Sequence, residues 1–544
     1  NDATRKISHT KGGIAVAHNV EALMIIFSAT GFPSTARRRF VDPSVRRYVL
    51  YSRHSFRFQE GSILMNNKLE RKYGLFTAIC MVVGIVIGSG VFFKAQTILQ
   101  ITNGDMPLGV IAWLIGGAIM LACILTFAGM SQKYEKVNGI VDYAEATVGP
   151  KYGYYMGWFL STIYYPSLTA ALAWLSARYT LVFSDDVPEY AVLIHINEGG
   201  VVVGPECIAL MLFYLCCSYA VNALSPKLAG KIQASTTVIK LIPLGVMAIV
   251  GVIAGLASGQ LTENFVAPPL AVVGSKGSIL FAAVCATSFA YEGWIIATTI
   301  NSELKDSKRN LPKALTVGGI IVIATYLLYY IGVTGGASNA ELIEKGATVA
   351  FTNIFGNVIG NILNLFIAIS CIGTMNGLML ACCRGVYSVA ARGKGPATHM
   401  FSRVDEHTNM PNNSAVMGLL LCGFWGLYFY LSNLAGTWSH KTVFTGTIFE
   451  SVPFLFATEL PIITIYALYI PVFIQWIRKQ KGTSVWQHYI LPILAICGSG
   501  FLVIACLVSH GMGCFWYLIV FAFVMVLGGL LNRRTQRTVR AAGA

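Results

Sequence analysis

Charged residues are scarce in this chain of 544 residues, of which they make up only 12%. Hydrophobic residues make up 55%, and the mean hydropathy is +0.64. A soluble domain carries about 25% charged residues, and here the apolar residues stand in blocks long enough to cross about 30 Å of hydrocarbon. The composition therefore excludes soluble folds and predicts an all-α integral membrane protein.

The sequence also lacks the spacing patterns of metal sites. None of the nine histidines lies near the centre of an apolar block, which removes one common proton-relay residue. The 13 cysteines show no zinc or iron–sulfur pattern, and most lie inside apolar blocks, where free cysteine is a small buried hydrophobe. We expect no metal and no cofactor.

Clusters of polar residues that could serve an enzyme are also missing. Asp142 and Glu145 precede Gly149-Pro150, but their surroundings predict a solvated connection between two membrane spans. There is no selectivity ring that would indicate an ion channel. The sequence therefore predicts neither a membrane enzyme nor a channel.

The formal net charge of +15 comes from two sources. Residues 1–63 form a basic segment with ten Lys and Arg against four Asp and Glu. We predict that this segment is a disordered or non-native extension and that the functional protein starts near Met65. Residues 64–534 are the predicted membrane domain, and residues 535–544 a cytoplasmic tail.

Twelve membrane spans are predicted after Arg71. Their cationic flanks are asymmetric: 23 Lys and Arg lie on one side, five on the other, and Lys240 lies inside a span. By the positive-inside rule both termini are cytoplasmic, so the charge indicates topology, not nucleic-acid binding. The predicted spans are 74–101, 107–130, 152–184, 204–223, 228–257, 278–300, 314–337, 357–390, 414–433, 458–477, 487–509 and 512–531.

The first span contains Gly84, Gly88, Ser89 and Gly90 near mid-membrane. Unwound backbone is tolerated at that depth only where it lines a cavity. The N–H groups that begin the outer half-helix would suit a carboxylate, and the carbonyls that end the inner half would suit an ammonium group. The alternative is that these small residues only allow close helix packing.

A second interrupted span lies five spans later, where residues 288–294 read Ser-Phe-Ala-Tyr-Glu-Gly-Trp. Paired interruptions in two halves are the best sequence indication of an inverted-repeat transporter with its site between them. Spans 1–5 and 6–10 would then be the repeats, with discontinuous helices 1 and 6. Spans 11 and 12 would be additions.

These motifs resemble the amino acid–polyamine–organocation (APC) superfamily, whose fold is LeuT-like, and within it the L-type amino acid transporter branch, closest to bacterial serine/threonine exchangers. The resemblance covers about Leu69 to Arg534. It rests on residues 84–92 (Gly-Ile-Val-Ile-Gly-Ser-Gly-Val-Phe), 289–294, 310–314 (Asn-Leu-Pro-Lys-Ala), 376–377 (Asn-Gly) and 240–243 (Lys-Leu-Ile-Pro).

The resemblance implies which residues bind substrate. Ser89 and Gly90 would hold the substrate carboxylate, carbonyls near Val86, Phe289 and Glu292 the α-ammonium group, and Phe289 would gate the site. The full predicted set is Val86, Gly88, Ser89, Gly90, Phe289, Ala290, Glu292 and Gly293. Spans 3, 8 and 10 would complete the pocket, with Tyr164, Tyr165, Ser370, Thr374 and Asn376 as candidate linings.

The position of Lys240 inside a span requires an explanation, because inserting a lysine at mid-membrane costs roughly 2.5–3.5 kcal/mol on insertion scales. It could snorkel to an interface. Alternatively, its ammonium group lies beside carbonyls near Gly84 and Val86 and the hydroxyl of Ser370, where related sodium-coupled folds hold a cation. The branch carries a lysine here and works without sodium, so we expect sodium-independent transport.

The sequence thus predicts a facilitative exchanger of neutral L-amino acids that works by alternating access in a bacterial cytoplasmic membrane. A proton-coupled symporter of the same fold is the alternative, because Glu292 is either an intramembrane proton acceptor or a cap on unwound backbone. Eukaryotic members pair with a glycoprotein through a cysteine after span 3. Residues 184–203 contain none, so no disulfide-linked heavy subunit is expected.

Overall fold

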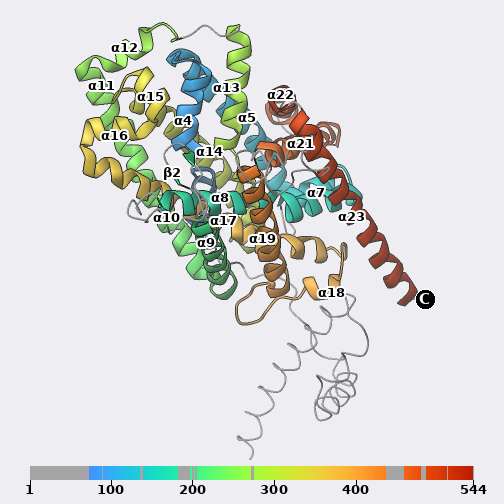
Figure 1. Ribbon diagram of the computed structural model, residues 1–544. Coiled ribbons are helices and arrows are strands. Elements are labelled where there is room, and N and C mark those ends of the chain that lie inside the picture. Colours follow the sequence, from blue (N-terminus) through green and yellow to red (C-terminus); the bar gives the residue numbers. More distant parts are fainter. Residues whose placement is uncertain are drawn as a thin grey trace, which may run out of the picture. The chain divides into compact units, whose positions relative to one another are not determined.

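The computed structural model describes residues 71, 73–88, 90–134, 139–181, 197–198, 201–202, 205–270, 275–435, 459–479, 485–510 and 512–542. The predicted basic extension, residues 1–63, and Ser89 lie outside the described residues. The described part is helical almost throughout (Figure 1), apart from a two-residue antiparallel pairing of β1 (Asn197–Glu198) with β2 (Val201–Val202).

The helices of the first half begin with two short ones that together cover the first predicted span. In order they are α3 (Leu75–Val86), α4 (Gly90–Ile101), α5 (Met106–Lys133), α6 (Gly139–Thr147), α7 (Pro150–Phe159), the π-helical turn η2 (Leu160–Tyr164), α8 (Tyr165–Leu181), α9 (Pro205–Leu224), α10 (Pro226–Val246), η4 (Met247–Gly251), α11 (Val252–Ser258) and α12 (Gln260–Val266).

The second half begins with another interrupted helix and ends with the C-terminal one. In order its elements are α13 (Lys276–Ala290), the 3-10 helix η5 (Trp294–Glu303), α14 (Ser307–Thr334), α15 (Asn339–Lys345), α16 (Ala347–Phe355), α17 (Asn357–Ala390), α18 (Thr398–Phe401), α19 (Asn412–Ala435), α21 (Glu459–Lys479), η6 (Trp486–Ile490), α22 (Leu491–His510) and α23 (Met512–Ala542).

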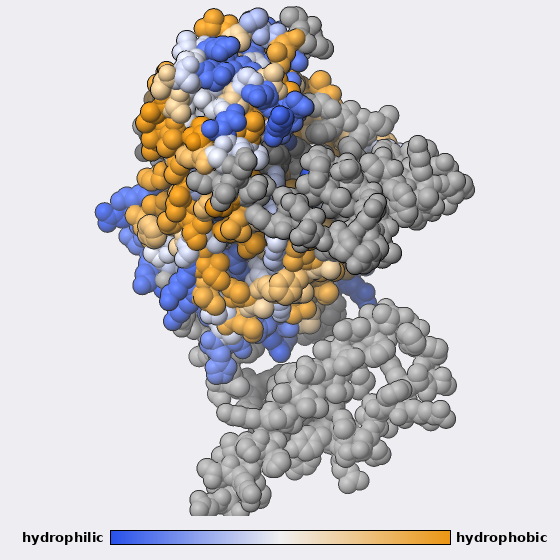
Figure 2. Space-filling view, turned by 60° about the vertical axis from the view of Figure 1, so that its left-hand side comes forward, coloured by the Kyte–Doolittle hydropathy of each residue, from blue (hydrophilic) through white to orange (hydrophobic). Residues whose placement is uncertain are grey.

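Nine helical segments within the described residues are long and apolar enough to cross a membrane, and the bent pair α3–α4 makes up to ten. The two remaining predicted spans, 152–184 and 414–433, fall in α7–α8 and α19, which are helical. Figure 2 shows a broad apolar band on one face, with hydrophilic residues gathered above and below it. The protein is therefore a multi-pass, all-helical membrane protein, as predicted.

Both predicted interruptions are present. α3 ends at Val86 and α4 starts at Gly90 with a bend of 46° between them. α13 ends at Ala290, and Gly293 then takes a φ of +104° before η5. A side chain would be strained at that angle, so a glycine at position 293 lets the chain turn where the sequence predicts the break.

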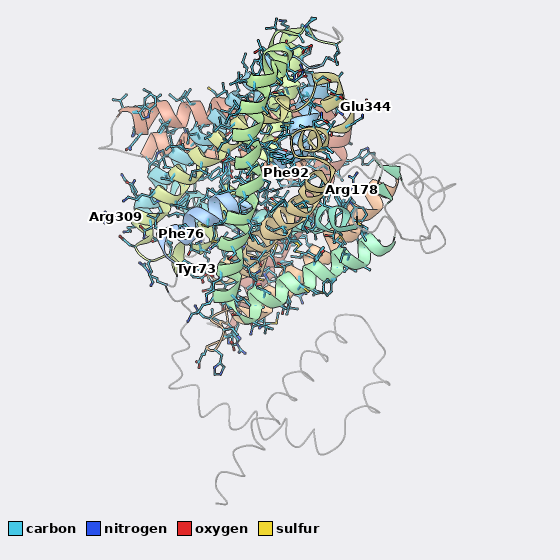
Figure 3. The ribbon with its side chains drawn as sticks, turned by 90° about the vertical axis from the view of Figure 1, so that its left-hand side faces the viewer. Tyr73, Phe76, Phe92, Arg178, Arg309 and Glu344 are labelled. Carbon is cyan, nitrogen blue, oxygen red and sulfur yellow. The ribbon has the colours of Figure 1, made fainter. Side chains whose placement is uncertain are left out.

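The two broken segments are joined at one end of the molecule. The backbone N–H of Tyr73 donates to the carbonyl of Glu303 at 3.0 Å, and that of Lys305 donates to the carbonyl of Tyr73 at 2.9 Å. Tyr73 precedes α3, and Phe92 on α4 lies on the other side of the first break (Figure 3). The start of the first segment and the end of the second are therefore tied together.

The predicted solvated connection at Asp142 is wrong. Residues 139–147 form α6, and Asp142 is buried. Its carboxylate and that of Glu145 pair with Arg392, at the end of α17. The pairing joins residues about 250 positions apart, so the local sequence around Asp142 does not reveal it.

A second ion pair is buried more deeply. Arg384 Nε lies 2.5 Å from Glu303 Oε1, and the side chains are 3% and 0% exposed. Arg384 lies within α17 and contacts Glu303, the last residue of η5. Burial of both partners makes the pair costly to break.

Candidate functional site

A small cavity of about 40 Å³ lies between the two helix breaks. Both breaks contribute walls, and α8, α17 and α21 close the sides. The lining is apolar except for one carboxyl and one hydroxyl group. It consists of Ile85, Val86, Gly88, Gly90, Leu168, Ala171, Leu172, Phe289, Glu292, Gly293, Thr374, Leu378 and Ile462.

Tyr326, on α14, connects the two breaks. Its hydroxyl lies 2.9 Å from the carbonyl oxygen of Val86 and 2.9 Å from that of Ala290, which end α3 and α13. The side chain is buried, and its ring packs against Trp113 and Tyr291. The hydroxyl lies within hydrogen-bonding distance of carbonyls at two helix C-termini, where intrahelical partners are missing, and its one hydrogen can be donated to either of them.

The two breaks lie close together at Gly90. A Cβ atom placed on it would lie 3.0 Å from Ala290 Cα and 3.4 Å from the ring of Phe289. The neighbour at 3.0 Å is backbone, which cannot rotate away. The close approach therefore requires a glycine at the first residue of α4, beside the cavity.

Lys240 is fully buried and points into the first break. Its Nζ donates to the carbonyls of Gly84 and Ile87, each at 2.6 Å, to Thr374 Oγ1 at 3.0 Å and to the Ser370 carbonyl at 3.3 Å. An ammonium group has three N–H donors, so four oxygens more than satisfy it. The side chain does not snorkel to an interface.

Two details of this predicted contact are corrected. The second carbonyl at Lys240 belongs to Ile87, whereas that of Val86 accepts from Tyr326. Ser370 offers Lys240 its carbonyl, while its hydroxyl lies 3.3 and 3.2 Å from the carbonyls of Ile87 and Gly88. The unwound backbone is thus held from α10, α14 and α17 together.

Glu292 is the carboxyl group of the cavity wall. It is 5% exposed, and its Oε1 accepts a hydrogen bond from the Tyr164 hydroxyl at 2.5 Å. Tyr164 belongs to the π-helical turn in the third predicted span. The carboxyl is therefore anchored to a neighbouring helix while it borders the cavity.

Phe289 also borders the cavity, at the end of α13. The ammonium group of Lys94, one turn into α4, lies 5.5 Å from the centroid of its ring. A cation at that distance from an aromatic ring is attracted by the ring quadrupole. The contact joins α4 to α13 beside the cavity.

Of the predicted side-chain pocket, only Thr374 is in the lining. Tyr164 lies one contact away, behind Glu292, and Tyr165 is buried without reaching the cavity wall. The amide of Asn376 bonds to the Asn222 side chain at 2.9 Å and faces α9. Leu168, Ala171 and Leu172 line the cavity from α8 instead, a face that helical spacing could not distinguish.

The helix ends around the cavity have opposite polarity. α4 begins at Gly90, and a helix N-terminus carries partial positive charge; α13 ends at Ala290, and a C-terminus carries partial negative charge. The two helix ends are complementary in charge to a small molecule with an anionic and a cationic group. A central cavity between two broken membrane helices defines a transporter.

Comparison with known proteins agrees with this class. Residues 73–531 match the family model described as amino acid permease, and the chain belongs to the amino acid permease family. The predicted relationship to the APC superfamily and to L-type transporters is confirmed.

Three relatives illustrate the range of transporters to which the chain is similar. The serine/threonine exchanger SteT of Bacillus subtilis (strain 168) is 28% identical over 458 residues, which is 82% of this chain and 94% of SteT. The b(0,+)-type amino acid transporter 1 of Mus musculus is 26% identical over 86% of this chain and 88% of its own length. The large neutral amino acids transporter small subunit 2 of Homo sapiens is 25% identical over 63% and 62%.

Proposed function

We propose that this permease exchanges small neutral L-amino acids across the cytoplasmic membrane, without sodium, by alternating access. The observation that carries the proposal is the cavity between the two helix breaks. An N-terminus at Gly90 and a C-terminus at Ala290 border it from opposite segments. A zwitterion matches both helix ends at once.

The backbone would bind the part that all amino acids share. The N–H groups around Gly88 and Gly90, together with Ser89 outside the described residues, would receive the carboxylate. The last-turn carbonyls of α13 would receive the ammonium group, although that of Ala290 is also used by Tyr326. Binding by backbone makes this half of the site independent of the substrate's side chain.

The remaining walls favour a small, uncharged side chain. Leu168, Ala171, Leu172, Leu378 and Ile462 are apolar, and the cavity is only about 40 Å³. The lining offers no cationic side chain for an acidic substrate. Thr374 and Glu292 are polar groups that a hydroxyl could meet, which fits the serine/threonine exchange named for SteT.

Lys240 supports sodium independence. Its ammonium group already neutralises the carbonyls of Gly84 and Ile87, which end the inner half of the broken segment. A sodium ion would have to displace a buried, hydrogen-bonded cation. A fixed lysine therefore supplies the positive charge that an ion would otherwise bring.

For the transport cycle we infer twelve spans in the order first predicted, with both termini cytoplasmic. Spans 1, 2, 6 and 7 would move against spans 3, 4, 5 and 8 as an inverted five-plus-five repeat. In the structure α17 packs most on α8, α19 and α10, whereas α14 packs most on α5, α3 and η4. The packing of α17 on α8 and α10, and of α14 on α3 and α5, supports two bodies, which meet where α14 contacts η4. No disulfide-linked heavy subunit is included in the proposal.

The test is uptake of labelled serine into proteoliposomes that contain the full chain. Exchange predicts uptake only when unlabelled amino acid is inside, with competition by small neutral amino acids and little by glutamate or lysine. Uptake into empty vesicles driven by an inward proton gradient would identify a symporter, with the pocket carboxyl Glu292 as the proton site. Absence of flux under every condition would exclude transport of these substrates.

A further inference from the structure

A second cavity lies far from the first, at the surface between α7, α17, α19 and α23. Its volume is about 290 Å³, and its walls are almost entirely apolar. α23 rests on α7 where the Tyr154 hydroxyl donates to the carbonyl of Gly528 at 2.6 Å. Beyond that contact the groove runs along Leu527 and Leu531 on one wall and Leu421 and Phe424 on the other.

The polar atoms of the groove are already paired. The indole N–H of Trp158 donates to the carbonyl of Val524 at 2.9 Å, and that of Trp425 donates to the carbonyl of Thr162 at 2.7 Å. The Thr162 hydroxyl donates to the carbonyl of Trp158 at 2.7 Å. The groove therefore has little to offer an amino acid, but it presents two indole rings and leucine side chains to a hydrocarbon chain.

One end of the groove meets a cationic stretch. Asn532 accepts from the backbone N–H of Gly395 at 3.1 Å, and Gln536 donates to the carbonyl of Gly393 at 3.0 Å. These bonds hold the last turns of α23 against the loop that follows α17, one residue before Pro396 in the groove wall. The end of α23 and α18 lie at the same end of the molecule (Figure 1).

The exposed charges that α23 carries at this end are cationic. Arg533, Arg534 and Arg537 are exposed on α23, beside the two residues that contact the loop. Residues 391–404 and 528–544 contain no acidic residue. A basic pocket between membrane helices near a bilayer surface is a binding site for anionic lipid headgroups.

We propose that this groove holds an acyl chain of an anionic phospholipid whose phosphate lies against the arginines at the end of α23. The hydrocarbon chain fills the space between Trp158 and Trp425. Arg534, three residues after Leu531 and so on the same side of α23 as the groove, selects with Arg537 the charged headgroup over a zwitterionic one. The site is separate from the transport cavity, so it stands whether or not the proposed substrates are correct.

Native mass spectrometry of the purified full chain tests the proposal, with phosphatidylglycerol and phosphatidylcholine of equal chain length as probes. The wild type should keep one phosphatidylglycerol under activation that removes phosphatidylcholine. Leu527→Trp, which fills the groove, should reduce this retention at least about fivefold. Leu530→Trp, on the same helix but outside the lining and 57% exposed, should leave it unchanged.

Substitutions of charged residues test the contribution of the lipid headgroup separately from that of the acyl chain. Arg534→Gln with Arg537→Gln should abolish the preference for phosphatidylglycerol, whereas Lys308→Gln with Arg309→Gln, exposed at the start of α14, should preserve it. Leu421→Trp fills the groove from the opposite wall and replaces Leu527→Trp if that variant misfolds. Equal retention in all variants would overturn the proposal. A wild-type dimer that Leu527→Trp converts to monomer would also overturn it, because a second copy would then occupy the groove.

Discussion

The ammonium nitrogen of Lys240 lies 2.6 Å from the carbonyl oxygen of Ile87, the residue that caps the inner half of the broken first segment. This contact joins α10 to the wall of the transport cavity. It explains how a lysine can be fully buried in a membrane helix, because the charge meets the negative end of a helix instead of lipid.

Replacement of Lys240 by Met should abolish most transport. The carbonyls of Gly84 and Ile87 would lose hydrogen bonds to a charged donor, each worth about 1.5–3 kcal/mol. We expect serine exchange to fall at least about tenfold, measured as initial rates in proteoliposomes. Lys231→Met, exposed on the same helix, is the matched control. Normal exchange by Lys240→Met would show that the break does not need this cation.

Tyr326→Phe should remove the contact through which α14 joins the two helix breaks. It removes the hydroxyl that serves the carbonyls of Val86 and Ala290, and an unsatisfied buried carbonyl costs about 1–3 kcal/mol. We expect a lower melting temperature and at least about fivefold slower exchange. Tyr329→Phe is the control, since within the described residues its buried hydroxyl has no hydrogen-bond partner. Equal effects of the two substitutions would contradict the bridging role.

Gly90→Ala should impair transport through steric contact alone. The added methyl group would lie 3.0 Å from Ala290 Cα, and overpacking of this kind costs about 1–3 kcal/mol. We expect exchange to fall about 10- to 100-fold with the protein still folded, measured by transport and thermal unfolding. Gly245→Ala, with open space around it on α10, should have no such effect. A Gly90→Ala variant that exchanges serine at the wild-type rate would show that transport does not depend on the close approach at Gly90.

Lys94 should act through Phe289. A cation–π contact is worth about 0.5–2 kcal/mol, so Lys94→Met should raise the KM for serine about 2- to 30-fold. Phe289→Leu removes the ring, and Lys94→Met should then add nothing further. A double-mutant cycle of KM values measures this coupling. Additive effects of the two substitutions would show that the two side chains act independently.

The buried pair of Arg384 and Glu303 should show a different pattern. Arg384→Leu leaves a carboxylate buried without its partner, which costs about 3–5 kcal/mol, whereas replacing both partners by apolar residues is often neutral. We therefore expect a large fall in melting temperature for Arg384→Leu and substantial recovery in the double variant with Glu303→Leu. Arg309→Leu, exposed on α14, is the control. A double variant as unstable as the single one would contradict this expectation.

Hydrophobic patterning located the helices well. The predicted span 357–390 coincides with α17, and the breaks fall where glycine and a mid-span glutamate interrupt apolar sequence. The sequence left two positions open for Lys240, snorkelling to an interface or a place beside the first break that the family resemblance implies, and the structure shows the second. The positions of the helices and breaks depend on local composition, which the sequence displays directly.

Contacts between distant residues were not predictable in the same way. Tyr326 lies 240 positions from Val86, in a span with several tyrosines and no pattern to distinguish one of them. Asp142 pairs with Arg392, which lies two residues after the end of α17. Asn376 faces α9 instead of the cavity because one helix turn changes the face that a residue occupies. Each of these depends on how helices pack, not on their own sequence.

Sodium dependence of exchange tests the central claim most directly. Proteoliposomes loaded with unlabelled serine take up labelled serine in buffer whose only monovalent cation is sodium, or choline in its place. With Lys240 fixed in the break, the account predicts the same initial rate in both buffers. Uptake that collapses in choline and returns with sodium would contradict it.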